Sequence, residues 1–412
     1  MHILLLNDDA LPATRGGAAI AVDRLRREYA RRGHRVTLLT THQDVSRERA
    51  ERGGDAVGEI ISLFVAYPLR KRHRKCIRNP AVAPLLETLF ADLKPDVVHA
   101  HNLHTYLTYE SLLIARRFTD RIFLTAHDTF LVSFDRVRGA GYERAALRGE
   151  GYRMHVWHHL RDAGRKYWPL RNRLIRKMLR KSGTRVIAMS KAAALFLGRN
   201  GIPVSEVIPN GVTIPAMPSE SAVALFRKRF HLTGPTVLFG GRVSADKGVF
   251  ALLDAMEDVL KDLPKVSLLL VGEKERITPA LRNCSPRLQE AIRLTGWMTQ
   301  EEMPLAYAAA DIVTTPSLYL DSFLMINIEA MSMEKPVVGT CFGATPEIVE
   351  HERTGLIMHP RETEKFAEAL LRLLRNPTEA KKMGEAGRAR AEKHFSLASQ
   401  TEHYLRLFHS HS

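Results

Sequence analysis

The sequence predicts two doubly wound α/β domains that face each other across a cleft. Short apolar runs alternate with helical patterns along the chain, and the apolar residues of each run are consecutive, as in parallel strands covered on both faces. The alternation forms two series, separated by a linker at residues 209–218 that contains prolines and a glycine. A length of 412 residues is about right for two cores, since domains cluster near roughly 100–200 residues.

The first domain is expected over residues 1–212. It begins with a strand at residues 2–7, followed by a helix that opens at Gly16-Gly17 and ends near Arg32. Gly33 stands where a helix C-cap belongs. Further buried strands are expected at residues 35–41, 96–100, 122–126 and 185–189.

The second domain is expected over residues 213–390. Its predicted strands, with helices between them, are residues 236–239, 266–271, 312–314 and 336–339. The last stretch, residues 391–412, has an amphipathic pattern, which predicts a C-terminal helix that returns to the first domain.

Composition narrows the class of protein. A hydrophobic content of 45% and a charged content of 26% exclude wholesale disorder. No apolar run approaches the ~20 residues that a membrane-spanning helix needs, and the apolar start lacks the basic residues and long core of a signal peptide. Cys76, Cys284 and Cys341 are far apart and in no metal-ligand spacing. We therefore expect a cytoplasmic protein.

The chain is strongly basic, with 61 basic against 45 acidic residues and a formal charge of +16. Two basic stretches, residues 70–78 and 153–181, lie in the first half, and the second also contains Trp157 and Trp168. Two interpretations stay open: solvated helical faces, or a surface that binds anionic lipid and holds the protein peripherally at the inner face of the plasma membrane. The lack of a recognised reader motif argues against nucleic acid.

Several common site signatures are missing from the sequence. It contains no phosphate-binding loop ending in Gly-Lys-Ser/Thr, no Gly-x-Gly-x-x-Gly after a strand and no Gly-x-Ser-x-Gly elbow. It also lacks an Asp-x-Asp pair, so no metal is expected. His99 and His101, at the end of a predicted strand, could be a pair of metal ligands. No carboxylate or cysteine accompanies them at ligand spacing, so we expect them to be structural.

A glycine-rich turn at residues 239–248 follows a predicted strand and precedes a helix. Its glycines let the backbone come close to a ligand. Arg242 offers a planar fork and Lys247 a point charge, a pair that suits a diphosphate without metal. An ordinary strand–helix turn with solvated charges is the alternative that the local sequence leaves open.

Two acidic residues flank the next predicted helix start. Asp321 lies in the loop at residues 316–323, and Glu329 stands eight positions later on the helix. Free amides at that helix N-terminus can hold hydroxyls or phosphate oxygens. A carboxylate accepts two hydrogen bonds at once, which suits the neighbouring hydroxyls of a ribose or sugar.

In this order and spacing, the motifs resemble the family 4 retaining glycosyltransferases, which have the two-domain GT-B fold. The resemblance covers nearly the whole chain. The motifs that carry it are Gly16-Gly17, residues 95–101, His127-Asp128, residues 208–212, Gly241-Arg242, Lys247-Gly248, Pro316-Ser317, Asp321, residues 329–331, 335–338 and 346–349, and Thr354-Gly355.

The resemblance implies a role for each matching residue. Arg242 and Lys247 hold the donor diphosphate, Glu329 binds the ribose, and Asp321 lies near hydroxyls of the transferred sugar. His127 contacts that sugar near the reacting centre, and the loop at Trp297 recognises the base. The implied catalytic residues are His127, Arg242, Lys247 and Asp321. The implied donor-binding residues are Gly16, Gly17, Arg242, Lys247, Trp297, Asp321, Phe323, Leu324, Met325 and Glu329.

Two positions depart from the family pattern. Asp321 replaces the usual Glu and is one methylene shorter, and Leu324 replaces a common Gly and has less backbone freedom. Both departures are expected to reshape the pocket of the transferred sugar.

The function implied is that of a retaining, metal-independent glycosyltransferase of the hexosyltransferase type. It would move a sugar from a nucleotide-diphosphate sugar, with no other cofactor, to a glycan, lipid-linked or small-molecule acceptor in surface polysaccharide or glycoconjugate biosynthesis. Two alternatives stay open: a GT-B nucleotide-sugar epimerase, which needs no acceptor, and a non-catalytic basic scaffold that docks on membranes.

Overall fold

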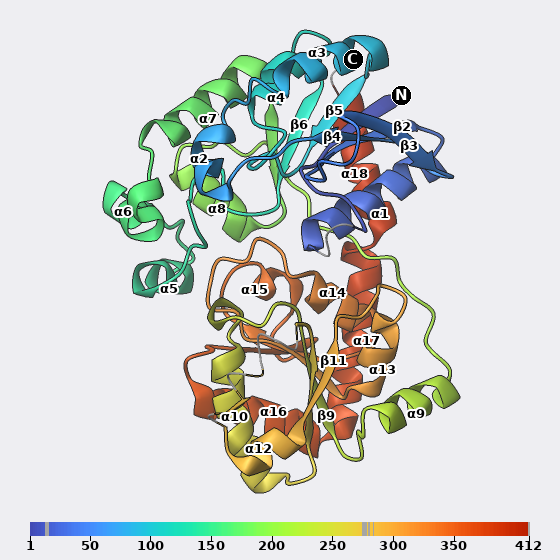
Figure 1. Cartoon of the computed structure of the whole chain (residues 1–412). Coiled ribbons are helices and arrows are strands. Elements are labelled where there is room, and N and C mark those ends of the chain that lie inside the picture. The colour runs from blue at the N-terminus through green and yellow to red at the C-terminus, as the bar shows by residue number, and fades with distance from the viewer. Residues whose placement is uncertain (13–15, 274–277, 279–280, 283, 411–412) are drawn as a thin grey trace. The chain divides into compact units, whose positions relative to one another are not determined.

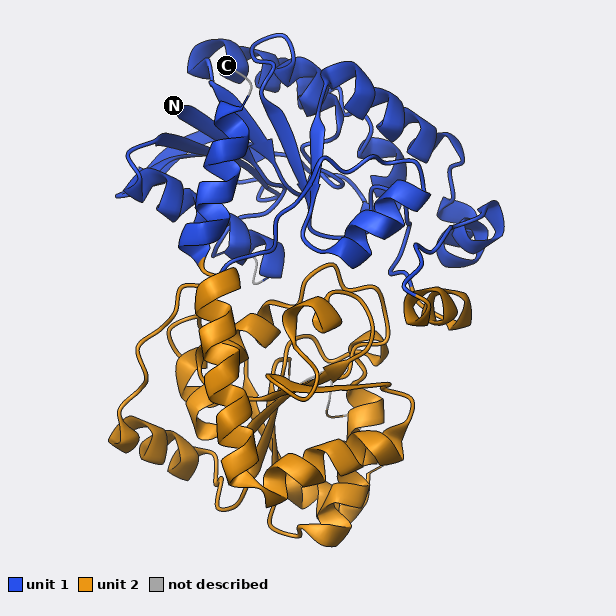
Figure 2. Cartoon of the chain, turned by 180° about the vertical axis from the view of Figure 1, so that it is seen from behind, with its two compact units in different colours: residues 1–137, 149–211, 397–412 blue, residues 138–148, 212–396 orange. Residues whose placement is uncertain are grey.

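The computed structural model describes residues 1–12, 16–273, 278, 281–282 and 284–410 and contains two α/β units (Figure 1). Unit 1 comprises residues 1–137, 149–211 and 397–412, and unit 2 comprises residues 138–148 and 212–396 (Figure 2). Each unit is built on a mainly parallel sheet whose strand order reverses at its centre. The predicted fold class of two doubly wound, Rossmann-like domains is confirmed.

Unit 1 contains an eight-stranded sheet in the order β3-β4-β2-β1-β5-β6-β7-β8. All the pairings are parallel except that of β3 with β4. The strands are β1 (His2–Leu6), β2 (Arg35–His42), β3 (Ala50–Asp55), β4 (Gly58–Phe64), β5 (Val97–Ala100), β6 (Ile122–Ala126), β7 (Arg185–Ala188) and β8 (Glu206–Val207). The edge strands β3 and β8 and the inner strand β4 were not predicted; β3 is polar and largely exposed, so it has no apolar run that would indicate a strand.

Unit 1 contains α-helices and short 3-10 helices in addition to this sheet. They are α1 (Gly17–Arg31), η1 (Leu69–Lys71), α2 (Arg72–Lys75), α3 (Ala83–Leu93), α4 (Glu110–Ala115), α6 (Val156–Ala163), η2 (Gly164–Lys166), α7 (Leu170–Ser182), α8 (Lys191–Arg199) and α18 (Leu397–His409). The C-terminal α18 belongs to the core, because Phe408 packs on Tyr29 of α1 and the Tyr404 hydroxyl lies 3.0 Å from Thr125 Oγ1 on β6.

Unit 2 contains a six-stranded parallel sheet in the order β11-β10-β9-β12-β13-β14. The strands are β9 (Thr236–Gly240), β10 (Ser267–Val271), β11 (Ile292–Gly296), β12 (Ile312–Thr315), β13 (Val337–Thr340) and β14 (Gly355–Met358). Its helices are α5 (Ala140–Leu147), α9 (Glu220–Arg229), η3 (Ala245–Lys247), α10 (Val249–Asp262), α12 (Pro286–Ala291), α13 (Met303–Ala309), α14 (Met325–Ser332), α15 (Thr345–Ile348), α16 (Thr363–Arg375) and α17 (Pro377–His394).

The C-terminal stretch differs from the prediction of one returning helix at residues 391–412. The helix α17 stays in unit 2, where Gly384 comes so close to Glu334 that an added Cβ would lie 1.9 Å from its carbonyl oxygen. Helix α17 ends at its C-cap Phe395, whose carbonyl oxygen accepts a hydrogen bond of 2.8 Å from the Val212 amide. Only α18, from Leu397 onward, packs in unit 1.

Residues 138–148 also differ from the predicted boundaries. The sequence places them in the first domain at residues 1–212, whereas in the structure they pack with unit 2. The side chains that dock them come from distant parts of the sequence, so no local pattern indicates this. Among the described residues, no helix is both long and apolar enough to cross a bilayer.

Candidate functional site

Each sheet reverses its strand order between two central strands, and α/β proteins bind ligands at the carboxyl ends of such strands. In unit 2 the reversal lies between β9 and β12, and in unit 1 it lies between β1 and β5. The glycine turn at residues 239–248 follows β9, and the loop at residues 316–323 follows β12. Both predicted clusters of unit 2 therefore lie at the same switch point.

Gly248 permits the close contact between the turn at residues 239–248 and the loop at residues 316–323. It has a left-handed φ of +74°, and a Cβ there would lie 1.8 Å from the Pro316 carbonyl oxygen. Only a glycine allows this approach. The Leu318 amide donates to the Asp246 carbonyl oxygen at 2.8 Å, which joins the segments a second time.

Lys247 and Asp321 form an ion pair across this contact, with 2.6 Å between Nζ and Oδ2. The Tyr319 hydroxyl donates to the same Oδ2 at 2.5 Å, and the Lys247 ammonium lies 5.3 Å from the centre of the Tyr319 ring. Burial opposes the charged form of Lys247, but the Asp321 carboxylate and Tyr319 together outweigh it and raise the pKa of Lys247 above its usual value. At neutral pH this lysine is therefore a fixed positive charge.

Arg242 lies in the same turn as Lys247 and is exposed. The backbone before it is held in place, because the Gly241 amide donates to the Val271 carbonyl oxygen at 2.9 Å. Gly241 has a φ of +124° and no atom within 4 Å of an added Cβ, so glycine is needed there for conformation and not for packing. The predicted diphosphate residues Arg242 and Lys247 thus come from one turn.

Glu329 lies in the second turn of α14 and is half-buried. Its Oε2 accepts a hydrogen bond of 2.9 Å from the Tyr307 hydroxyl on α13. The start of α14 packs on the glycine turn, since a Cβ on Gly240 would lie 2.7 Å from Ile326 Cδ1. The amides at the N-terminus of α14 therefore lie close to the turn that carries Arg242 and Lys247.

The other predicted donor residues of unit 2 have different surroundings. Phe323 and Leu324 are buried, Met325 is half-buried, and Leu324 is the N-cap of α14 without a side-chain capping bond. Trp297 directly follows the edge strand β11 and is half-buried. Its role in recognising the base stays a prediction.

The predicted histidine of unit 1, His127, follows β6 and is held by a second histidine. His101 Nδ1 lies 2.9 Å from His127 Nε2, and His101 is buried. Burial lowers the pKa of His127 to about 4 and that of His101 well below its usual value, so both rings are neutral at neutral pH.

His99 and His101 are buried side by side, with 4.2 Å between ring centroids. His99 Nε2 lies 2.9 Å from Thr125 Oγ1, and its Nδ1 lies 3.3 Å from the Tyr29 hydroxyl. The described residues contain no group of three or more His, Cys, Asp or Glu side chains that could hold a metal ion. The bonds of His99 fit the structural role predicted for it.

Gly16 and Gly17 lie at the start of α1 and are exposed. A Cβ on Gly17 would meet no atom within 4 Å, so the fold itself leaves room for a side chain there. Residues 13–15, which complete this predicted loop, lie outside the described residues.

Sequence reasoning did not identify Asp8, at the carboxyl end of β1. Its buried carboxylate accepts hydrogen bonds of 2.7 to 2.8 Å from the amides of Thr105, Tyr106 and Leu107. Burial raises the pKa of Asp8 to about 6. The signal was available, since an acid directly after a first strand lies at the switch point.

The two tyrosines that hold the acids of unit 2 were also missed. Tyr319 stands two positions before Asp321, within the motif itself, and could have been found there. Tyr307 comes from α13, twenty-two positions before Glu329, and nothing in the sequence connects the two.

The two basic stretches of unit 1 meet around Phe134. Its ring lies 4.8 Å from that of His73 and 5.3 Å from that of Tyr167. Arg171 stacks over the same ring and is 1% exposed, so it is a structural residue and not part of a charged surface. The exposed basic residues are Arg70, Lys71, Arg74, Arg78, Arg153, Arg161, Arg165, Lys166, Arg173, Arg176, Lys177, Arg180 and Lys181. The exposed apolar side chains beside them are Leu69, Val156, Trp157, Leu160 and Leu170.

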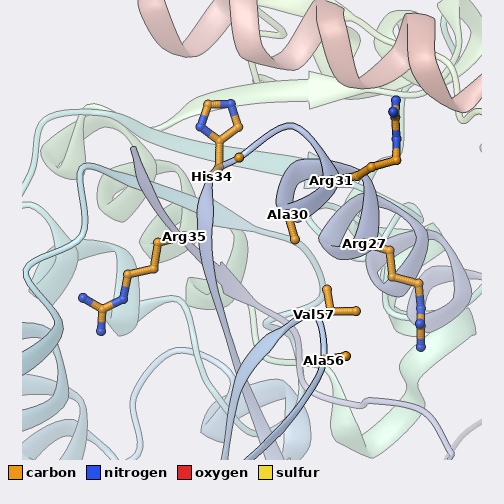
Figure 3. A pocket seen from close by; sticks show the side chains of 8 residues that line it. Arg27, Ala30, Arg31, His34, Arg35, Ala56 and Val57 are labelled. Atoms are coloured by element: carbon orange, nitrogen blue, oxygen red, sulfur yellow. The ribbon is translucent and has the colours of Figure 1, made fainter.

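Two further cavities lie in unit 1. One, of about 530 Å³, lies at the end of α1 and is lined by Arg27, Arg31, His34 and Arg35 (Figure 3). Arg27 pairs with Asp23 and Arg31 pairs with Glu28, and these acids offset part of the positive charge of the cavity lining. The other, of about 980 Å³, lies between α8 and β8. Neither is lined by a residue predicted to bind the donor.

Comparison with known families assigns both halves of the chain. Residues 15–214 match the model of Glycosyltransferase Family 4, and residues 234–376 match that of Glycosyl transferases group 1.

Two curated relatives illustrate the similarity. The GDP-mannose-dependent monoacylated alpha-(1-6)-phosphatidylinositol monomannoside mannosyltransferase of Corynebacterium glutamicum is 28% identical over 57% of this chain and 65% of that protein. The D-inositol 3-phosphate glycosyltransferase of Segniliparus rotundus is 33% identical over 45% of this chain and 42% of that protein. In both, the match spans less than two thirds of the relative.

Among solved structures, a sucrose-phosphate synthase from Thermosynechococcus elongatus superposes with a TM-score of 0.76 at 21% identity, covering 99% of this chain and 98% of that one. HepE of Anabaena, solved with UDP and glucose, superposes with a TM-score of 0.70 at 20% identity and covers all of both chains. These likenesses establish the GT-B fold.

Proposed function

Because the chain belongs to the family 4 glycosyltransferases, we propose that it is a retaining, metal-independent hexosyltransferase. It takes a sugar from a nucleotide-diphosphate sugar and transfers it to a glycan, lipid-linked or small-molecule acceptor, in surface polysaccharide or glycoconjugate biosynthesis. The observation that carries the proposal is the ion pair of Lys247 and Asp321 at the switch point of unit 2.

Each residue of this ion pair can still bind the nucleotide-sugar substrate. Both Lys247 and Tyr319 bind Oδ2 of Asp321, and within the described part of the chain no hydrogen bond reaches Oδ1. Oδ1 is then the atom that accepts a hydroxyl of the transferred sugar. The ammonium has three donors, so Lys247 can hold Asp321 and a phosphate oxygen together.

In the reaction, the bond from the anomeric carbon to the diphosphate oxygen breaks and a bond to the acceptor oxygen forms on the same face. Arg242, Lys247 and the amides at the start of α14 stabilise the negative charge of the leaving diphosphate. The departing phosphate takes the proton of the acceptor hydroxyl, so no carboxylate is needed as a covalent nucleophile. His127, neutral at neutral pH, contacts the sugar near the reacting carbon by a hydrogen bond and not by charge.

The names of relatives suggest which donors to test first. The mannosyltransferase of Corynebacterium glutamicum is GDP-mannose-dependent by name, and HepE was solved with UDP-glucose. GDP-mannose and UDP-glucose are therefore the first candidates.

The surface around Phe134 supports a lipid-linked acceptor and peripheral attachment to anionic membranes. Trp157 is 79% exposed beside a dense set of arginines and lysines, the combination that binds at the headgroup level. In a co-sedimentation assay, the protein should bind to vesicles of phosphatidylglycerol and sediment with them, and it should not bind to vesicles of phosphatidylcholine. The charge-neutral variant Trp157→Ala should weaken the binding, and equal binding to both vesicle types would contradict this part of the proposal.

The first experiment is a thermal-stability screen against UDP, GDP, ADP, TDP and their sugar conjugates in the presence of a metal chelator. A ligand at a hundredfold excess over its dissociation constant should stabilise the protein by about 3 kcal/mol. Lys247→Ala should abolish the shift, while Lys261→Ala, which removes an exposed lysine paired with Asp258 on α10, should leave it intact.

Products then separate transfer from the alternatives. Release of free nucleoside diphosphate together with a glycosylated acceptor supports a transferase, and retention follows from the anomeric configuration of the product. Conversion of the donor sugar with no acceptor present indicates an epimerase. The absence of a shift with every nucleotide would favour the non-catalytic scaffold.

A further inference from the structure

Residues 138–148, which we call the strap, come from the first half of the sequence but pack in unit 2 (Figure 2). The strap consists of Arg138, Gly139, the helix α5 and Arg148. Gly139, with a φ of +94°, precedes the helix, and Gly149, with a φ of +68°, follows the strap. These left-handed positions, where side chains are disfavoured, are the turns by which the chain enters and leaves it.

The first residue of the strap contacts both segments that carry the Lys247–Asp321 pair. The Arg138 guanidinium forms an ion pair with Asp246, the residue before Lys247. The Arg138 backbone forms an antiparallel β-bridge with Tyr319, the residue whose hydroxyl holds Asp321. One residue of the strap therefore fixes the turn after β9 and the loop after β12 together.

Tyr142, in the middle of the strap, secures the backbone of Asp321 from another side. Its hydroxyl accepts a hydrogen bond of 3.0 Å from the Gly343 amide, and its ring packs on Phe342. Gly343 has a φ of +62°, and a Cβ there would lie 2.5 Å from the Asp321 carbonyl oxygen. The Ala344 amide donates to that same oxygen at 3.0 Å.

The third anchor lies away from these segments. Glu143 forms a forked ion pair with Arg361, with 2.9 Å between the closest nitrogen and oxygen. Arg361 directly follows Pro360 in the turn between β14 and α16 and is 55% exposed. Neither residue belongs to the predicted donor site, so this pair can be broken without touching it.

We propose that the strap completes the donor site of unit 2, with Arg138 and Tyr142 as positioning residues that hold Lys247, Tyr319 and Asp321 in their binding arrangement. The inference rests on the proposed function and deepens it, because donor affinity then depends on residues that the first half of the chain contributes. A site whose loops are already ordered loses less conformational entropy when it binds, so an undocked strap weakens donor binding. The alternative is that the strap contributes only to the stability of unit 2.

A charge exchange in the full-length protein separates these two roles. Glu143→Arg and Arg361→Glu each place like charges together and should undock the strap, while the double variant restores an attractive pair. The dissociation constants of GDP and UDP, measured by calorimetry, should rise on the order of tenfold in each single variant, equal to 1.4 kcal/mol, and return to within about twofold in the double variant. Lys365→Glu, four positions from Arg361 and with the same change of charge, removes an exposed pair with Glu362 and should have no effect.

Amide hydrogen exchange tests the positioning without any ligand. Exchange at residues 316–323 and 341–346 should speed up in the single variants and in Tyr142→Phe, and slow again in the double variant. Unchanged exchange and unchanged dissociation constants in the single variants, even with a lower melting temperature, would overturn the inference. So would single variants that bind more weakly without recovery in the double variant. A wild-type chain that binds no nucleotide would count against the proposed function, and the exchange data would still decide whether the strap positions these loops.

Discussion

Gly248→Ala tests whether the close approach of the turn after β9 to the loop after β12 sets up the donor site. Gly248 has φ +74° and ψ 17°. Gly183, the C-cap of α7, has nearly the same conformation, with φ +66° and ψ 20°. An added Cβ would lie 1.8 Å from the Pro316 carbonyl oxygen at Gly248 but would meet nothing within 4 Å at Gly183. The two substitutions therefore share a backbone cost and differ in a single collision.

The backbone cost of an L-residue in the left-handed region is about 1–2 kcal/mol, and it should be the whole cost of Gly183→Ala. At Gly248, relief of the collision to the closest separation that real Cβ atoms show, 3.0 Å, requires a movement of 1.2 Å, from 1.8 Å. Overpacking of this kind adds about 1–3 kcal/mol. Because the displaced loop carries Asp321, the same movement separates it from Lys247.

Calorimetric unfolding and nucleotide titration measure the two effects. With about 2–4 °C per kcal/mol for a unit of this size, Gly248→Ala should lower the melting temperature of unit 2 by several degrees more than Gly183→Ala lowers that of unit 1. It should also weaken nucleotide binding at least tenfold, while Gly183→Ala leaves binding unchanged. Equal losses of stability together with wild-type affinity in Gly248→Ala would refute the argument.

Three further predictions follow from the site. Arg242→Ala should lower kcat by about 10²–10³-fold if its guanidinium stabilises the leaving diphosphate, and near-normal turnover in a steady-state assay would exclude that role. His101→Leu should lower kcat on the order of ten- to a hundredfold because His127 loses its bonded neighbour. Calorimetry should find nucleotide affinity unchanged, since the neighbours of His101 are His127 and His99, and neither is predicted to hold the nucleotide. Asp8, whose pKa is raised from 3.8 to about 6, binds its proton more tightly in the folded state, so its own contribution to stability should be fully present below pH 4 and be lost, by on the order of 3 kcal/mol, as the pH rises through 6. Denaturant titrations between pH 3.5 and 7 should show this loss in the difference between the wild type and Asp8→Asn, since the other titrating groups are common to both proteins.

The sequence predicted the parts of the fold that depend on local pattern. The strands β1, β2, β5, β6 and β7 of unit 1, and β9, β10, β12 and β13 of unit 2, all appear as continuous apolar runs and were predicted within one or two residues of their bounds. The edge strands β3, β8, β11 and β14 were missed, and so was β4 beside β3. All five are only partly buried, so they do not need such a run. The strap was predicted to belong to the first domain, whereas it packs in unit 2. The sequence could not indicate this, because its docking depends on side chains such as Asp246 and Arg361, more than a hundred positions away.

For the candidate site, the sequence identified residues but not what holds them. Lys247 and Asp321 were predicted as separate ligands of a donor, and their ion pair depends on the contact at Gly248, which only the structure reveals. His101 was predicted to be structural, and its bond to His127 gives it a place beside a predicted catalytic residue. In both cases the missing information is a contact between strand ends that lie far apart in the sequence.

The two departures from the family pattern have different consequences in the structure. Leu324 has φ −93° and ψ 99°, a conformation open to any L-residue, and it is 4% exposed, so the fold neither requires glycine there nor presents the leucine side chain to a ligand. Asp321, by contrast, is short enough for its Oδ2 to be held by both Lys247 and Tyr319. A glutamate would carry its carboxylate one methylene beyond the reach of these partners or displace them. We therefore expect Asp321, and not Leu324, to be the departure that reshapes the proposed pocket of the transferred sugar, and Tyr319 is the residue whose exchange should accompany a return to glutamate.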